Sequence, residues 1–401
     1  MRFLRRLLDR QAKAFEAGGR LERFYPLWEA VDAFLYTTGK VTRTSPHVRD
    51  GMDLKRIMIL VVIALIPCAL MAMYNTGLQA NLAIEQGGTA LGWRGAMIAR
   101  LGLGFSARSI VACFVHGALY YVPVVLVTFV VGGGWEVLFA IVRRHEVNEG
   151  FLVTGMLFPL ILPPTIPLWQ VGLGISFGVV IGKEIFGGTG MNIWNPALTA
   201  RAFLFFGYPA NFSKDEAWIA VDGYSRATPL AGLVEGGVAY LDEKVGWLNS
   251  FLGFEQGTMG ETSALACLLG AALLIGTGVA SWRIMSGVAI GTIVAATAFN
   301  LIGSETNAAF GTPFWWHVVL GGWAFATVFM ATDPVTAPYT NPARWAYGLC
   351  IGALIILVRV VNPAFPEGAM LAILFMNIFS PVLDHFVVQA NIKGRTARYA
   401  A

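Results

Sequence analysis

The chain has 401 residues, of which 56% are hydrophobic and 13% are charged, and its net charge is +4. Soluble proteins carry about 25% charged residues, so the composition excludes an ordinary soluble domain and predicts a polytopic membrane protein. The modest charge gives no sign of nucleic-acid binding. The four cysteines lie far apart in apolar segments and the five histidines lack an H-x-x-x-H spacing, so we expect no protein-ligated metal centre.

Residues 1–53 alternate charged residues with apolar anchors such as Phe24 and Trp28. This pattern predicts an interfacial amphipathic helix followed by an extended arm. Because no short apolar stretch with a small-residue cleavage site opens the chain, we expect the N-terminus to be retained. We assign residues 1–53 to a cytoplasmic N-terminal arm.

Ten apolar segments approach the roughly 20 residues that an α-helix needs to cross a bilayer. The third contains Pro159, Pro163 and Pro164 and the fifth is short, so these two are expected to be broken or partly spanning. The ten expected segments cover residues 57–75, 108–131, 150–168, 169–186, 196–208, 262–280, 284–302, 316–332, 344–361 and 368–390.

Lys and Arg favour cytoplasmic loops, and most of them fall inside if both termini are cytoplasmic. The loop at 208–260, with seven acidic residues against three basic ones, is then periplasmic. Arg94 and Arg100 are the exceptions. This topology places Thr228 on the periplasmic side of a bacterial inner membrane.

Four polar landmarks recur at offsets of 111 to 115 residues, for example Glu149 with Glu261 and Asp222 with Asp333. Five expected spans separate the copies, and an odd number reverses their direction, so the pattern predicts an inverted repeat. We expect an all-α fold of about ten spans in two five-helix repeats, resembling urea and ammonium channels. Such an architecture also suits a channel or transporter, which is the rival functional class. The expected units are the arm (1–53), the first repeat (54–208), the periplasmic loop (209–260), the second repeat (261–390) and a cytoplasmic tail (391–401).

A polar stretch, DGYSRATP at residues 222–229, interrupts the apolar sequence. Asp222 and Ser225 can cap a turn, and Pro229 suits the first turn of a following helix. The stretch resembles the flavin-transferase acceptor signature D-G-x-S/T-G-A-T of the Na⁺-pumping NADH:quinone oxidoreductase and Rnf families. That resemblance implies FMN attached through its phosphate to Thr228. Arg226 replaces the usual Gly, and an Arg beside a phosphodiester could donate a charge-assisted hydrogen bond.

Several ionisable groups lie in or beside the expected spans, where a charge is costly. Lys183 and Glu184 near a helix end are read as snorkelling or paired. Asp333 before Pro334 could be a helix cap, and Asp384 lies in an apolar run near the basic tail. Dehydrated Na⁺ asks for several oxygen ligands, and broken spans free backbone carbonyls that could supply them.

The segment GGGWE at residues 132–136 is expected to follow the second span. Glycines there would let a flat ligand such as a quinone head approach the backbone, with aromatic neighbours on its faces. A tight helix-packing corner explains the same residues equally well.

Longer motifs extend the resemblance to nearly the whole chain. VRRHEVNEGF, LILPPTIPLWQ, KEIFGGTG, ATDPV and RVVNPAFPEGAMLAILF, together with the long polar arm, resemble the NqrB proteins of the Na⁺-pumping NADH:quinone oxidoreductase family. The related RnfD proteins share the core but usually lack so long an arm.

The resemblance implies a subunit of a six-protein complex, with subunits A, C, D, E and F as partners, that oxidises NADH, reduces ubiquinone and exports Na⁺. A flavin transferase would attach FMN, and membrane lipid would surround the chain. The implied sites are Thr228 for covalent FMN, Asn192, Asn195 and Asp333 for noncovalent riboflavin, Gly132, Gly133 and Glu136 for quinone, and Glu29, Glu136, Asp333 and Asp384 for Na⁺. NADH would bind another subunit.

Overall fold

The computed structural model describes residues 54–400 except 91, 145–146, 148–149, 214–216, 223–227 and 363–366. Of the preceding arm it describes 10–12, 14–15, 18–25, 28 and 32. Helices dominate this part of the chain. A short antiparallel pair joins β1 (Thr89–Ala90) to β2 (Val221–Asp222), with Thr89 opposite Asp222.

Among the described residues, six helical segments are long and apolar enough to cross a membrane. They are α3 (Leu54–Glu85), α5 (Ile110–Arg143), α7 (Leu168–Val180) with the 3-10 turn η2 (Glu184–Phe186), α13 (Trp282–Ile302), α16 (Asn341–Val361) and α17 (Ala369–Ala400). The prediction of a polytopic helical membrane protein is therefore confirmed.

The remaining elements are shorter. They comprise the α-helices α4 (Gly92–Leu101), α6 (Gly150–Leu160), α8 (Pro196–Gly207), α9 (Ala210–Ser213), α10 (Pro229–Tyr240), α11 (Trp247–Leu252), α12 (Ala264–Gly276), α14 (Phe314–His317) and α15 (Trp323–Phe325), the 3-10 turns η1 (Glu22–Phe24) and η5 (Ala308–Gly311), and the π-helical turns η4 (Leu241–Val245) and η6 (Ala326–Met330).

Four of the ten expected spans hold only short helices. The breaks at 150–168 and the short helix at 196–208 agree with the prediction, because prolines at 163 and 164 cannot continue α6. Continuous helices over 262–280 and 316–332 are wrong. Gly278 (φ +73°) ends the turn after α12, and Gly321 (φ +59°) separates α14 from α15.

Two helix pairs begin at matching intervals. Helices α6 and α7 start at residues 150 and 168, and α12 and α13 start at 264 and 282, so the same spacing recurs in both halves of the chain. The ten-span inverted repeat stays a prediction that this spacing supports.

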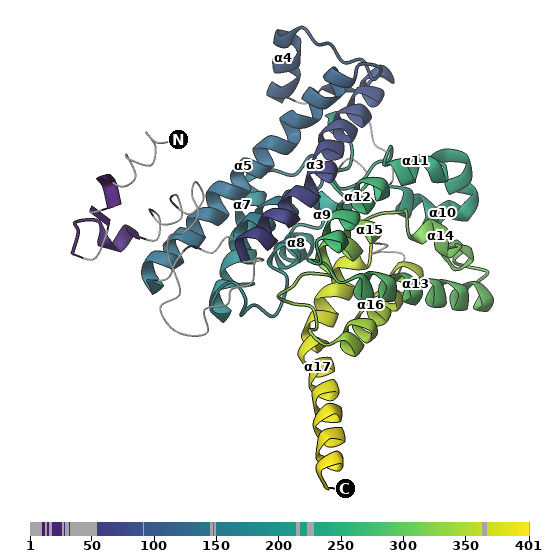
Figure 1. The fold of residues 1–401 in the computed structure, drawn as a ribbon. Coiled ribbons are helices and arrows are strands. Elements are labelled where there is room, and N and C mark those ends of the chain that lie inside the picture. The colour runs from purple at the N-terminus through teal and green to yellow at the C-terminus, as the bar shows by residue number, and fades with distance from the viewer. Residues whose placement is uncertain are drawn as a thin grey trace.

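Glycines allow the long helices to pack closely. Helices α3 and α5 lie side by side (Figure 1), and a Cβ at Gly77 or Gly117 would overlap the backbone of the other helix. The pair α13 and α16 uses Gly291 and Gly352 in the same way. Small residues that let helix backbones approach are typical of membrane helix packing.

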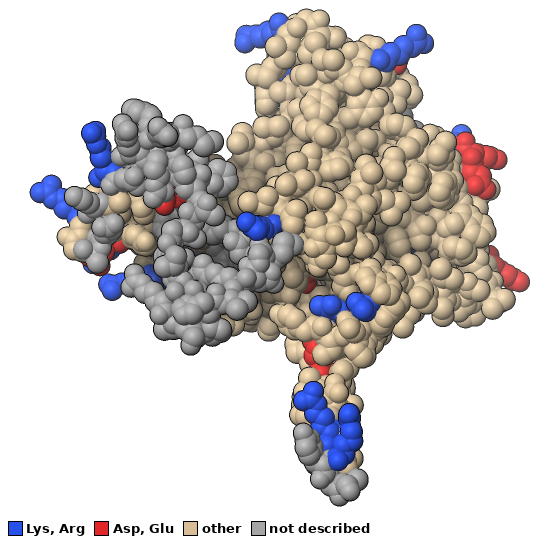
Figure 2. Space-filling view, viewed as in Figure 1, with Lys and Arg blue, Asp and Glu red and all other residues tan. Residues whose placement is uncertain are grey.

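The charged side chains lie toward the extremities of the molecule. Figure 1 shows α17 extending away from the other helices and α4 at the opposite end. Figure 2 shows Lys and Arg on both of these ends, whereas the surface between them is largely uncharged. Arg94 and Arg100, the two residues that do not fit the expected charge asymmetry, both lie on α4.

Candidate functional site

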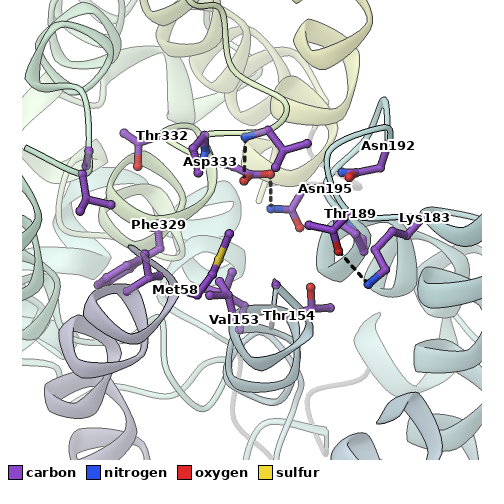
Figure 3. A pocket seen from close by; sticks show the side chains of 18 of the residues that line it. Met58, Val153, Thr154, Lys183, Thr189, Asn192, Asn195, Phe329, Thr332 and Asp333 are labelled. Atoms are coloured by element: carbon purple, nitrogen blue, oxygen red, sulfur yellow. Dashed lines mark hydrogen bonds between the residues drawn. The ribbon is translucent and has the colours of Figure 1, made fainter. Parts of the chain in front are cut away.

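The candidate riboflavin residues line one cavity of about 680 Å³, here called the central cavity. Its walls come from α3, α6, the end of α12, the 183–196 segment and the 329–335 segment. Figure 3 shows Asn192, Asn195 and Asp333 on one side of it, with Met58 and Phe329 among the residues that complete its walls. Asp333 lies 138 residues after Asn195 in the sequence, so the structure brings together two segments that are far apart along the chain.

Asn195 has two separate roles because the two ends of its amide point to different partners. Its Oδ1 atom caps α8, accepting hydrogen bonds from the backbone N–H of Ala197 (3.0 Å) and Leu198 (3.3 Å). Its Nδ2 atom donates to Asp333 Oδ2 at 3.4 Å (Figure 3). The cap fixes the side chain, so its amino group is held beside the carboxylate.

Asp333 is anchored by its own turn. Its Oδ1 accepts from the backbone N–H of Val335 at 3.3 Å, and its Oδ2 accepts from the Thr336 hydroxyl at 3.0 Å. These bonds cap a turn, whereas the helix cap that the sequence suggested is wrong, because the next helix begins only at Asn341. Asp333 also lines the central cavity, so capping the turn and facing a ligand are compatible roles.

Glycines shape the segment that carries Asn192. Gly187, Gly188 and Gly190 all have positive φ, which turns the chain out of η2 and toward α8. Asn192 is buried, donates to the carbonyl of Trp194 at 2.9 Å and accepts from the Gly190 N–H at 3.3 Å. Its side chain therefore holds the loop that forms this wall.

Lys183 is a cavity residue that the sequence analysis did not assign to a site. Only 3% of it is exposed, so the snorkelling interpretation is wrong and the pairing interpretation is correct. Its ammonium forms an ion pair with Glu136, lies 3.7 Å from Glu184 and donates to the Thr189 hydroxyl at 3.2 Å. Arg143 binds Glu184 from the other side at 3.0 Å. The ion pair thus connects the central cavity with the candidate quinone residue.

The candidate quinone residues lie inside α5, not after it as expected. A Cβ at Gly132 would lie 2.5 Å from the ring of Phe151, and one at Gly133 would lie 3.6 Å from it. The helix continues because the glycines give room to this aromatic ring. The close contact agrees with the helix-packing interpretation, and the quinone role of Gly132, Gly133 and Glu136 stays a prediction.

Thr228 caps α10, and Pro229 occupies the first turn as expected. The Thr228 hydroxyl accepts from the backbone N–H of Ala231 at 3.3 Å, and the residue is half-buried. Asp222 lies in β2, opposite Thr89. Ser225 and Arg226 lie outside the described residues.

Thr228 opens onto a second cavity of about 340 Å³, here called the threonine cavity. Several charged residues gather at or beside it: the buried Arg201, Glu255, Glu261 and Arg359, and the half-buried Glu367. Arg201 on α8 forms an ion pair with Glu367 and lies 3.6 Å from Glu261. Arg359 on α16 donates to backbone carbonyls of α14 and of the turn after it, at 2.8 and 2.9 Å.

Burial dominates the electrostatics of the segment between α11 and α12. It raises the pKa of Glu255 to about 8, and it raises the pKa of Glu261 despite the nearby Arg201 guanidinium. The sequence analysis assigned no role to Glu255, Arg359 or Glu367. The available signal was charge near the end of an apolar segment, inside it for Arg359 and before it for the two glutamates, a signal that also fits ordinary interfacial residues.

The candidate Na⁺ residue Asp384 lines neither the central cavity nor the threonine cavity. Asp384 on α17 accepts from the backbone N–H groups of Tyr339 (2.8 Å) and Thr340 (2.9 Å) and from the Thr340 hydroxyl (2.6 Å). These bonds tie α17 to the start of α16. Glu29 lies outside the described residues. In the part of the chain that is described, no three His, Cys, Asp or Glu side chains are grouped to hold a metal ion.

Comparison with known proteins extends these observations. Residues 41–393 match the model of the NQR2, RnfD, RnfE family. The chain is 57% identical to the B subunit of the Na(+)-translocating NADH-quinone reductase of Azotobacter vinelandii and to that of Stutzerimonas stutzeri, in each case over 98% of this chain and 99% of the relative. It is also 57% identical to the subunit of the same name from Chromohalobacter salexigens, over 99% and 97% of the two chains.

Proposed function

The chain belongs to the NQR2, RnfD, RnfE family, and on that premise we propose that it is the membrane subunit of a Na⁺-translocating NADH-quinone reductase. The observation that carries the proposal is the identity of 57% to B subunits of that enzyme along nearly the whole length of both chains. In this complex the chain would work with subunits A, C, D, E and F in a bacterial inner membrane, with both termini cytoplasmic. Ten spans in two inverted halves would form its core.

Covalent FMN on Thr228 is the first cofactor of the proposal. The threonine hydroxyl lies at the N-terminus of α10, where backbone N–H groups and the helix dipole favour a phosphate. The adjoining cavity gives an attached group room beside it. FMN on this residue would supply one-electron and two-electron transfer, and a flavin transferase would install it. Thr228 would position the flavin, and Asp222, Ser225 and Arg226 would complete the acceptor signature.

The second proposed cofactor is noncovalent riboflavin in the central cavity. The lining of this cavity combines apolar walls with a few amides, as small-ligand sites do. Riboflavin carries no phosphate, which suits a site where the Lys183 charge is already paired with Glu136. Asn192, Asn195 and Asp333 would orient its polar edge, and the buried walls would exclude water.

The quinone and Na⁺ sites complete the proposal. Ubiquinone would bind near Gly132, Gly133 and Glu136 with the N-terminal arm, and Na⁺ would pass Glu29, Glu136, Asp333 and Asp384. Support comes from Glu136, which is buried and forms an ion pair with Lys183, a residue that lines the central cavity. Broken helices near the cavity leave backbone carbonyls available to a cation.

The test is a complementation experiment. Membranes from a host that lacks its own copy of this subunit should regain Na⁺-stimulated NADH-dependent quinone reduction when this chain is supplied with the other five subunits and the flavin transferase. Solute flux through the isolated chain, with no restored electron transfer, would favour the channel class instead. Photolabelling of the assembled complex with a quinone analogue then tests whether this subunit contributes the quinone site.

A further inference from the structure

The lining of the threonine cavity is acidic. Glu255, Glu261 and Glu367 all line it, together with Thr228 at the N-terminus of α10. None of the roles proposed above uses these three carboxyl groups. Their side chains come from the segment between α11 and α12 and from the residues just before α17.

The charges of this cluster do not balance among the described residues. Arg201 pairs with Glu261 and Glu367, and Arg359 lies close enough to act on all three carboxyl groups. When all three carboxyl groups are ionised, they exceed the two guanidinium groups by one negative charge. Because burial raises the pKa of Glu255 to about 8, a proton on Glu255 offsets this charge near neutral pH, and a bound cation would compete with that proton. An uncompensated charge in a buried site is costly, so one positive charge is required to offset it.

Glu255 is the carboxylate with an incompletely bonded oxygen, although the Ser250 hydroxyl and the Gly321 N–H lie near enough to favour its ionised form. The residue is only 4% exposed, and within the described part of the chain its Oε2 atom has no hydrogen-bond partner. Buried polar atoms in proteins almost always have a partner, so an exception beside a cavity indicates a ligand that the protein chain does not itself supply.

Neutral oxygen atoms surround the same space. The hydroxyl-bearing residues Thr258 and Thr262 line the cavity with Glu261. Gly322 leaves space beside the Glu261 carboxylate, because a Cβ at this position would lie 2.6 Å from Glu261 Oε1. Carboxylate, hydroxyl and carbonyl oxygens are the ligands of hard cations, which also keep some of their water.

We propose that the threonine cavity binds a monovalent cation between Thr228 and the carboxylates of Glu255 and Glu261. The choice of Na⁺ as that cation rests on the proposed function, whereas the site itself rests on the geometry. A phosphodiester on Thr228 would add a further negative charge to the same cavity and would strengthen cation binding. The site would lie beside the attached flavin, apart from the candidate Na⁺ residues of the central cavity.

Equilibrium dialysis with ²²Na⁺ tests the proposal on the full-length chain purified in detergent with choline as the background cation. Glu255→Gln keeps the shape of the side chain but removes its charge, and it should weaken one class of Na⁺ sites at least tenfold. Gly322→Ala fills the space beside Glu261 and should weaken the same class if Glu255→Gln fails to fold. Glu243→Gln, at an exposed position on η4, should leave binding unchanged.

Identical Na⁺ titrations for the wild-type chain and both cavity variants would overturn the proposal. So would a wild-type chain that binds no Na⁺, because another group, such as the Arg226 side chain or a proton on Glu255, would then supply the missing charge. The same preparations, made with and without the flavin transferase, are examined for flavin fluorescence in a denaturing gel. Na⁺ binding without attached flavin would contradict the flavin proposal alone, and attached flavin without Na⁺ binding would contradict the cation site alone.

Discussion

Asn195 donates a hydrogen bond to Asp333 across 3.4 Å, although 138 residues separate the two along the chain. One residue caps α8 and the other follows η6, so the bond joins the two halves that the expected repeat relates. The bond also forms part of the wall of the central cavity. A change at this contact should therefore affect a ligand in the cavity before it affects the fold.

Replacing Asn195 with Ser tests the riboflavin site. Serine retains an oxygen that can cap α8, so stability should change little, but it lacks the amino group that reaches Asp333. We expect noncovalent flavin, extracted and quantified against covalent FMN in the same sample, to fall several-fold. Asn249→Ser on the exposed face of α11 is the matched control. Full retention of extractable flavin in Asn195→Ser would remove this residue from the site.

The ion pair between Lys183 and Glu136 should stabilise the fold as a unit. Replacing Lys183 with Met leaves two buried carboxylates without their ammonium, and breaking a buried pair costs about 3–5 kcal/mol. The double variant Lys183→Met/Glu136→Leu should recover most of that loss, because Arg143 still binds Glu184. Thermal unfolding of the four proteins in a double-mutant cycle measures the coupling. Additive effects would show that the two side chains act independently.

Variants at Asp384 distinguish a role in Na⁺ transport from a structural role. We expect Asp384→Ala to retain covalent FMN and to need a higher Na⁺ concentration for half-maximal quinone reduction. Thr340→Val is the control, because it removes one of the three hydrogen bonds to Asp384 and keeps the carboxylate. If both variants lower the yield of complex and neither changes the half-saturating Na⁺ concentration, Asp384 serves only to hold α17 against α16.

Because α13 and α16 pack closely, replacing a glycine at their contact should destabilise the chain far more than replacing a glycine elsewhere. A Cβ at Gly291 would overlap the backbone of α16, so Gly291→Val should lower the thermal unfolding temperature and the yield of purified chain. Gly276→Val on α12 is the control, because a Cβ there meets no atom within 4 Å. Equal stability of the two variants would contradict the helix contact as described.

The sequence was informative where chemistry is local. Thr228 followed by Pro229 predicted a helix start, and a helix does begin there, because capping and a fixed proline φ act within one turn. The membrane class followed from composition alone. The repeat landmarks paired Asp222 with Asp333, but the first lies in a strand and the second caps a turn, so their correspondence stays a prediction.

Features that depend on neighbours distant in sequence could not be predicted. The glycines at 132 and 133 suggested the end of a helix, yet Phe151 packs against that face and the helix continues. Lys183 near a helix end suggested snorkelling, but the partner that keeps it buried is on α5. The motifs of the central cavity were visible in the sequence, whereas the charge cluster beside Thr228 depends on four separate segments meeting.

Mass spectrometry of the peptide that contains Thr228 tests the central claim most directly. The chain is produced with the flavin transferase, denatured and digested, and Thr228→Val and the exposed Thr297→Val are processed in parallel. The wild-type and Thr297→Val peptides should carry the mass of an FMN group on Thr228, and the Thr228→Val peptide should carry none. The absence of FMN from the Thr228→Val chain should not reflect unfolding, because removing a helix cap costs only about 1 kcal/mol. An unmodified Thr228 in the wild-type chain, or FMN attached to another residue, would contradict the account.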